Sequence, residues 1–171
     1  YDVVGNVGGY EIMQGEKADN LGRTAASQAV KLLDSKQVPA GKYTCVLDNR
    51  MTGLLAHEAF GHACEADAIL AGASVLESLQ GEKVASESVS LIDDPTVPNT
   101  FGYFAYDWEG VASERHALIE DGVLKGYMHS LETSSRMGVK PNGSARAETY
   151  YNPPLVRMSN TYIAPGDMKK D

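Results

Sequence analysis

Two histidines and a glutamate lie close together within a stretch of small and apolar residues, "MTGLLAHEAFGHACEAD". His57 and His62 are five residues apart, and Glu58 directly follows the first histidine. Imidazole nitrogens bind Zn²⁺ in proteins, and a carboxylate beside the metal can accept a proton from a metal-bound water. These residue types predict a zinc site for peptide hydrolysis, with His57 and His62 as ligands and Glu58 as the general base.

The five-residue spacing requires a helix that departs from ideal α-helical geometry. Residues five apart on an α-helix point about 140° away from each other. Two nitrogens bound to one zinc ion, however, lie only about 3.4 Å apart. A one-residue π-bulge lowers the local angle and returns both side chains to one face, and Gly61 is the residue type that most easily accepts such a distortion. The motif therefore predicts a bulged helix.

Catalytic zinc usually has a third protein ligand, which the neighbourhood of the motif does not clearly supply. Glu65, three residues after His62, can lean toward the same helix face or can be a solvated carboxylate, as Asp67 can. Cys64 is expected in the core and Cys45 on a strand. The pattern thus also leaves open a packed helix whose histidines bond to nearby backbone.

The elements that must position this motif can be read from hydrophobic spacing. Apolar residues near a helical period predict a helix over about 20–35, and good helix formers predict another over about 50–70, which carries the motif. Alternation in "KYTCVLD" predicts a buried strand over 42–48.

The second half of the chain predicts a sheet. Four segments are rich in β-branched and aromatic residues, namely "SVSLIDD", "FGYFAYD", "HALIEDG" and "VLKGYMHS". Asp121-Gly122 predicts a tight hairpin flanked by His116 and His129, which are expected on the surface, and "LETSSRMG" predicts a short helix. The expected fold class is α+β, with early helices followed by a mainly antiparallel sheet.

Composition and charge limit the classes of protein. The 171 residues, 43% of them hydrophobic, predict one globular unit over 1–171, divided into a leader and helix at 1–41 and the motif helix with the sheet at 42–171. A formal charge of −8 argues against direct nucleic-acid binding. The absence of a long apolar run argues against a membrane span, and two cysteines without a CxxC pair favour a reducing, cytoplasmic setting.

Several segments resemble the TldD/PmbA family of metalloproteases. They are "GLLAHEAFGHACEAD", "SLIDD", "ALIEDGVLKGYMHS", "SRMG", "GSARAETY" and "RMSNTYIAPG", which occur in the family's order and cover nearly all of the chain from about residue 25 to 166. The family has also been described as modulators of DNA gyrase. Only its TldD half carries the H-E-x-x-x-H motif, so this sequence resembles TldD.

The resemblance implies roles for individual residues and partners. His57 and His62 take the positions of two zinc ligands, and Glu58 takes that of the catalytic glutamate. The family's third ligand is a cysteine far downstream, so the chain is expected to be a fragment of a longer TldD-like protein, with weak or absent zinc binding and no activity alone. The implied substrate is a peptide or unfolded polypeptide, and the implied partner is a PmbA-like subunit or a second copy.

Two further hypotheses come from other classes of protein. The chain could be a catalytically inert peptide-binding or subunit-pairing module, since the third ligand is absent and the second half is rich in sheet. A gyrase-associated regulator that contacts DNA is suggested by the family's older name, and the charge of −8 argues against it. Arg157 and Asn160 lie in a family-like segment that either shapes a turn or touches substrate.

Overall fold

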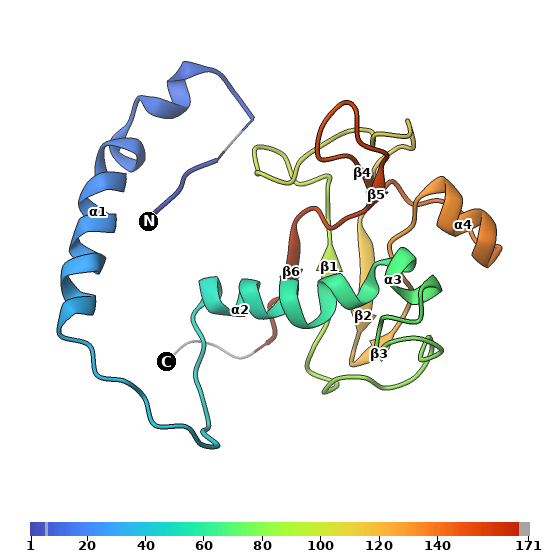
Figure 1. The fold of residues 1–171 in the computed structure, drawn as a ribbon, viewed down its shortest axis with the longest axis horizontal. Coiled ribbons are helices and arrows are strands. Elements are labelled where there is room, and N and C mark those ends of the chain that lie inside the picture. The colour runs from blue at the N-terminus through green and yellow to red at the C-terminus, as the bar shows by residue number, and fades with distance from the viewer. Residues whose placement is uncertain (6, 168–171) are drawn as a thin grey trace. The chain divides into compact units, whose positions relative to one another are not determined.

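The computed structural model describes residues 1–5 and 7–167, so residue 6 and residues 168–171 of the expected unit lie outside the described residues (Figure 1). The chain divides into two compact units. The first comprises residues 1–46 and 98–101, and the second comprises residues 47–97 and 102–171. The sheet and the histidine motif both belong to the second unit.

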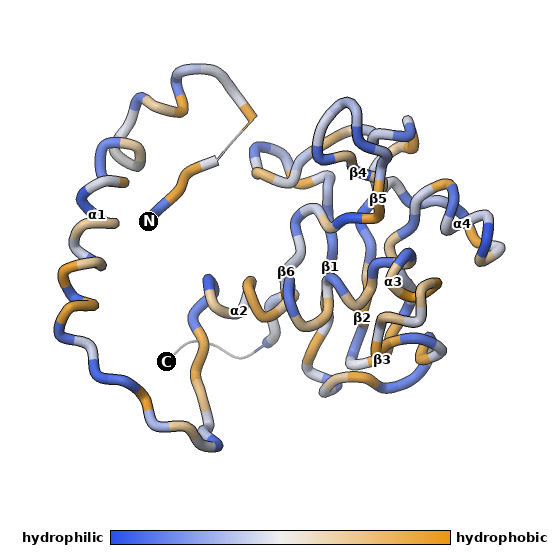
Figure 2. The backbone as a smooth tube through the Cα atoms, viewed as in Figure 1, coloured by the Kyte–Doolittle hydropathy of each residue, from blue (hydrophilic) through white to orange (hydrophobic). Residues whose placement is uncertain are grey.

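The first unit contains a 3₁₀ turn at Tyr10–Met13 and the helix α1 at Glu16–Leu33. The expected helix is confirmed, although it begins earlier than the sequence indicated. Apolar side chains near its C-terminal end are exposed, including those of Val30, Leu32 and Leu33, and Figure 2 shows the apolar residues along α1. No helix in the described part of the chain is long and apolar enough to cross a membrane.

The strand expected over 42–48 is wrong. The segment pairs with no strand among the described residues, and Tyr43 and Val46 are exposed rather than buried. Cys45 is exposed as well. Alternating apolar residues form a strand only where a neighbouring strand satisfies the backbone N–H and C=O groups, and no such neighbour pairs with this segment.

The second unit is built around a four-stranded antiparallel sheet with the strand order β3-β2-β1-β6. A separate pair, β4 with β5, lies beside it. The strands are β1 Leu91–Asp93, β2 His116–Glu120, β3 Val123–Leu124, β4 Ala145–Arg146, β5 Leu155–Val156 and β6 Thr161–Ile163. Together with the helices, this antiparallel sheet confirms the α+β fold class.

The sequence predicted the hairpin turn correctly but did not predict correctly which segments form strands. Asp121 and Gly122 have φ angles of 50° and 79°, as in a type I′ turn, and they connect β2 to β3 as expected. The strand expected in "FGYFAYD" is wrong, since Tyr106 makes only an isolated bridge with Ala112. Backbone hydrogen bonds from residues 104 and 107 instead close local loops.

The motif lies on a helical segment that changes type along its length. It consists of α2 Asn49–Leu55, a π-helical turn at Ala56–Gly61, a 3₁₀ turn at His62–Cys64 and α3 Ala66–Leu70. Asp48 begins it by accepting a hydrogen bond from the N–H of Met51 at 2.8 Å. The expected helix over 50–70 is confirmed, with a break at Glu65, whose ψ is 119°. There, the N–H of Ala66 donates to the carbonyl of Met128.

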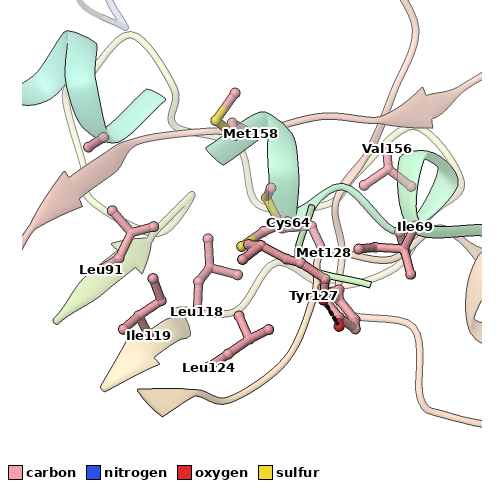
Figure 3. Close-up of a cluster of buried hydrophobic side chains, with 13 residues drawn as sticks. Cys64, Ile69, Leu91, Leu118, Ile119, Leu124, Tyr127, Met128, Val156 and Met158 are labelled. Atoms are coloured by element: carbon pink, nitrogen blue, oxygen red, sulfur yellow. Dashed lines mark hydrogen bonds between the residues drawn. The ribbon is translucent and has the colours of Figure 1, made fainter. Parts of the chain in front are cut away.

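Both α2 and the π-helical turn contact β6, so the motif is held against the sheet. A buried cluster lies between these elements, and Figure 3 shows Leu91, Leu118, Ile119, Leu124 and Met128 within it. Cys64 is part of this cluster and is fully buried, as the sequence predicted. Burying the apolar face of the motif helix thus fixes its position on the sheet.

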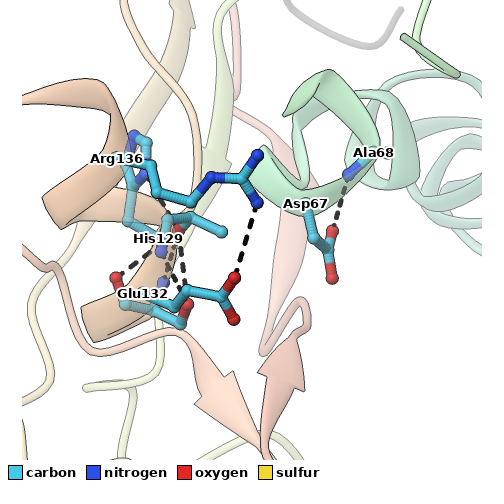
Figure 4. Close-up of polar contacts among 7 residues, drawn as sticks. Asp67, Ala68, His129, Glu132 and Arg136 are labelled. Carbon is cyan, nitrogen blue, oxygen red and sulfur yellow. Dashed lines mark hydrogen bonds and ion pairs between the residues drawn. The ribbon is translucent and has the colours of Figure 1, made fainter. Parts of the chain in front are cut away.

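His116 and His129 are buried, which corrects their expected place on the surface. His116 begins β2 opposite Asp93, and His129 directly precedes α4 at Leu131–Met137. The short helix expected in "LETSSRMG" is confirmed as α4. Its N-terminus carries a capping box formed by Ser130 and Thr133. Figure 4 shows His129 beside this helix, together with the ion pair between Arg136 and Glu132. A position beside a surface turn does not by itself make a side chain exposed, because the segments on both sides of the turn pack into the interior.

Candidate metal site

The backbone of the motif helix contains the distortion that the histidine spacing predicted. The N–H of His62 donates to the carbonyl of His57, five residues earlier, within the π-helical turn. The two imidazole rings are 4.8 Å apart between centroids and lie edge to face, with an interplanar angle of 86°. The predicted π-bulge is confirmed, and the two rings are neighbours.

Gly61 serves a different purpose from the one expected. Its φ and ψ are both −56°, which are ordinary helical values that any residue adopts. A Cβ atom at this position would overlap the sulfur of Met158 and lie 3.1 Å from its Cε. Because Met158 is buried, the missing side chain allows close approach of the helix to this methionine.

Both histidines open onto one cavity of about 420 Å³. Its other walls come from β4 and β5 and from the residues that follow each strand, namely Arg146, Ala147, Glu148, Leu155, Arg157 and Met158. Glu58 is exposed and is not among the lining residues. The structure therefore brings His57 and His62 together, but Glu58, the predicted general base, does not line the cavity.

Glu65 is neither solvated nor placed as a separate ligand. Its side chain is only 7% exposed, and one carboxylate oxygen, Oε2, lies 3.2 Å from Nδ1 of His62. The same oxygen lies 3.3 Å from a guanidinium nitrogen of Arg157. Burial raises the pKa of Glu65, while the hydrogen bond from His62 and the positive charge of Arg157 oppose that shift.

Cys64 and Asp67, two further candidate ligands from the sequence, have other surroundings. Burial, with the nearby negative charges of Asp93 and Glu65, raises the pKa of Cys64 to about 12, so its thiol stays protonated at neutral pH. Asp67 instead accepts a hydrogen bond from the N–H of Ala68, as Figure 4 shows. Among the described residues, no group of three or more His, Cys, Asp or Glu side chains is placed to hold a metal ion.

Sequence reasoning singled out Arg157 but missed the other residues that line the cavity together with the histidines. Arg146 donates to the carbonyl of Met158 at 2.7 Å, with its guanidinium carbon 5.5 Å from the centre of the Phe104 ring. Arg157 lines the cavity, whereas Asn160 shapes a loop by donating to the carbonyl of Asp94. The strands here are two residues long, too short for the alternation that would have marked their inward faces.

Comparison with known proteins decides the family. Residues 40–171 match the family described as PmbA/TldA metallopeptidase C-terminal domain. The chain belongs to this family. In sequence it is similar to a protein of Methanothermobacter thermautotrophicus named metalloprotease, with 47% identity over 98% of this chain and 36% of the relative. A protein of Saccharolobus solfataricus named zinc metalloprotease TldD homolog is 38% identical over 75% of this chain and 29% of its own length.

Solved structures give the same fold. The crystal structure of TldE from Thermococcus kodakarensis has a TM-score of 0.60 at 25% identity, covering 68% of this chain and 26% of that protein. A structure from Thermotoga maritima MSB8, whose name links it to modulation of a DNA gyrase, has a TM-score of 0.72 at 31% identity over 90% of this chain and 34% of its own. The chain spans about a third of the length of the relatives and solved structures that it matches.

Proposed function

We propose that this chain carries the zinc site of a metallopeptidase, in which His57 and His62 are metal ligands and Glu58 is the general base. The substrate class is peptides or unfolded polypeptides. The observation that carries the proposal is the π-type hydrogen bond between residues 57 and 62, because it places both imidazole rings side by side at one cavity. A packing role alone would not need two exposed histidines at this spacing.

The donor set is suited to zinc, since neutral imidazoles are among its usual ligands. When bound, the ion would lower the pKa of a water molecule and polarise a carbonyl group. His57 and His62 would hold it. Catalytic zinc usually has a third protein ligand, and among the described residues no group of three His, Cys, Asp or Glu side chains supplies one. The names of the relatives support a peptidase rather than an inert binding or pairing module.

The other residues of the site would bind and orient the substrate. Arg146 and Arg157 bring guanidinium groups to the cavity, and such groups donate hydrogen bonds to peptide carbonyl oxygens. Glu58, on the exposed surface of the same helical turn as His57, would accept a proton and return it to the leaving amine. Because Glu58 does not line the cavity, the side chain would have to turn toward the substrate for that step.

The test uses the protein at its natural length with the substitution Glu58→Gln, which keeps size and removes the proton acceptor. We expect cleavage of an unfolded polypeptide to fall at least about 100-fold, the usual contribution of a general base. Zinc content should be unchanged, since Glu58 is not a proposed ligand. Glu132→Gln, an exposed carboxylate on α4, is the control and should cleave normally. Unchanged turnover in Glu58→Gln would disprove the role of Glu58.

A further inference from the structure

We infer that Glu65 is a positioning residue for His62, which keeps the imidazole proton on Nδ1 and leaves Nε2 unprotonated for the metal. The inference rests on the proposed function, because it assigns His62 as a ligand. It adds a residue that binds neither metal nor substrate in its own right.

Geometry provides the first argument. Nδ1 of His62 lies 3.2 Å from Oε2 of Glu65, which is within reach of a hydrogen bond when the ring carries its proton on Nδ1. A neutral imidazole carries one proton, so a proton on Nδ1 leaves the lone pair on Nε2. Metal-binding histidines commonly donate their other nitrogen to a carboxylate in this way, which fixes the tautomer and the ring orientation.

Burial and charge provide the second argument. The side chain of Glu65 is 7% exposed, whereas that of His62 is 45% exposed, so the carboxylate is the buried partner and the ring is the accessible one. A carboxylate is costly to bury without partners. Arg157 lies 3.3 Å from the same oxygen, Oε2, and is itself held by a hydrogen bond to the carbonyl of Val156 at 2.7 Å. His62 and Arg157 therefore contact the same carboxylate oxygen of Glu65.

The backbone gives no competing reason for a glutamate at this position. Glu65 stands at the N-terminus of α3, but its side chain makes no capping hydrogen bond there. Its other oxygen, Oε1, is buried and has no hydrogen-bond partner in the described part of the chain. A residue retained only to begin the helix would bond to the first free N–H groups. The ties to His62 and Arg157 are thus the contacts that require this carboxylate.

Two variants separate the hydrogen bond from the charge. Glu65→Gln keeps an oxygen acceptor and the side-chain size, and Glu65→Leu removes the acceptor. We expect zinc affinity to fall in the order wild type, Gln, Leu, with a loss of about 10- to 100-fold for Leu. Asp94→Asn is the matched control, since Asp94 is a 6% exposed carboxylate near Arg115 and is not among the residues that line the cavity of His57 and His62. It should bind zinc as the wild type does.

The tautomer itself is the readout that a merely structural role would not affect. In the metal-free, natural-length protein at about pH 8, where imidazole is neutral, nitrogen NMR should show His62 protonated at Nδ1. The signal is assigned by its loss in His62→Ala. Glu65→Leu should abolish the preference and Glu65→Gln should retain part of it. Protonation of wild-type His62 at Nε2 would overturn the inference, and this observation stands even if Glu65→Leu does not fold.

Zinc titration of His62→Ala distinguishes the failure of this inference from that of the proposed function. If His62→Ala binds zinc as tightly as the wild type, His62 is not a ligand, and both proposals are overturned. If His62→Ala loses zinc while both Glu65 variants bind it normally, only the positioning role is overturned. Loss in His62→Ala with a graded loss in the Glu65 variants supports both.

Discussion

A single glycine determines how closely the histidine motif can approach the rest of the second unit. Gly61 lies within the π-helical turn, next to His62, with ordinary helical dihedral angles. Its neighbour Met158 is buried and also lines the cavity onto which the two histidines open. At the scale of one residue, the absence of a Cβ atom therefore links helix packing to the shape of the site.

The substitution Gly61→Ala should destabilise the protein by about 1–3 kcal/mol, the usual cost of overpacking a buried contact. The added methyl group would overlap the sulfur of Met158 and force the methionine or the helix to move. Gly53→Ala is the control, because a Cβ there meets no atom within 4 Å and alanine favours the helix. Urea unfolding of both variants checks this. Equal free energies of unfolding for the two variants would show that Met158 is not the constraint.

The turn of the β2–β3 hairpin, which the sequence predicted, is held by backbone hydrogen bonds to two other segments. Gly122 donates from its N–H to the carbonyl of Val89, and its own carbonyl accepts from the N–H groups of Val84 and Ala85. The turn thus ties the segment before β1 to the end of β2. A left-handed residue is needed there, and the close backbone leaves no space for a side chain.

We expect Gly122→Ala to lower the free energy of unfolding by at least about 1–3 kcal/mol, the cost of a strained left-handed residue. A Cβ atom would also lie 2.5 Å from the carbonyl oxygen of Ala85. Asp121→Gly, at the other left-handed position of the turn, should change stability by less than about 1 kcal/mol, because glycine accepts the same φ and mainly adds unfolded-state entropy. Thermal unfolding of the two variants compares them. A larger loss for Asp121→Gly would contradict the assignment of the constraint to Gly122.

Buried histidines influence the stability of the second unit as a whole. Burial lowers the pKa of His116, although the nearby carboxylates of Asp93, Glu114 and Asp94 act in the opposite direction. Burial also lowers the pKa of His129, and the proximity of His116 adds to the shift. Both rings therefore resist protonation in the folded state more than in the unfolded chain.

The pH dependence of stability follows from these directions. An unfolded histidine titrates near pH 6.5, so below that pH the unfolded chain binds protons that the folded protein excludes. The free energy of unfolding should decrease as the pH falls from about 7.5 to about 5.5, by up to about 1.4 kcal/mol per pH unit for each histidine. Urea unfolding across this range measures the slope.

His129→Asn should reduce that slope, because it removes one of the two groups that resist protonation. Ser135→Ala, an exposed substitution on α4 that removes no titratable group, should leave the slope unchanged. The same slope in His129→Asn and in the wild type would show that His129 does not contribute to the pH dependence.

Features that depend on neighbours in the chain were determined by the sequence. The helices over 16–33 and 131–137, the Asp121-Gly122 turn and the π-bulge of the motif all follow from local backbone preferences or from residue spacing. The α+β class followed from the order of these local patterns. Such features are predictable because the interactions that produce them join residues a few positions apart.

The tertiary structure decided what depends on distant partners. The segments 42–48 and 101–107 look like strands, but no neighbouring strand pairs with them in the described structure. His116 and His129 are buried because core residues close around them. Arg157 reaches Glu65 across 92 positions of the chain, and the residues that line the cavity together with the histidines come from β4 and β5 and the residues that follow each strand. Hydrogen-bond pairing, burial and cavity shape are set by packing between remote segments, which no local pattern encodes.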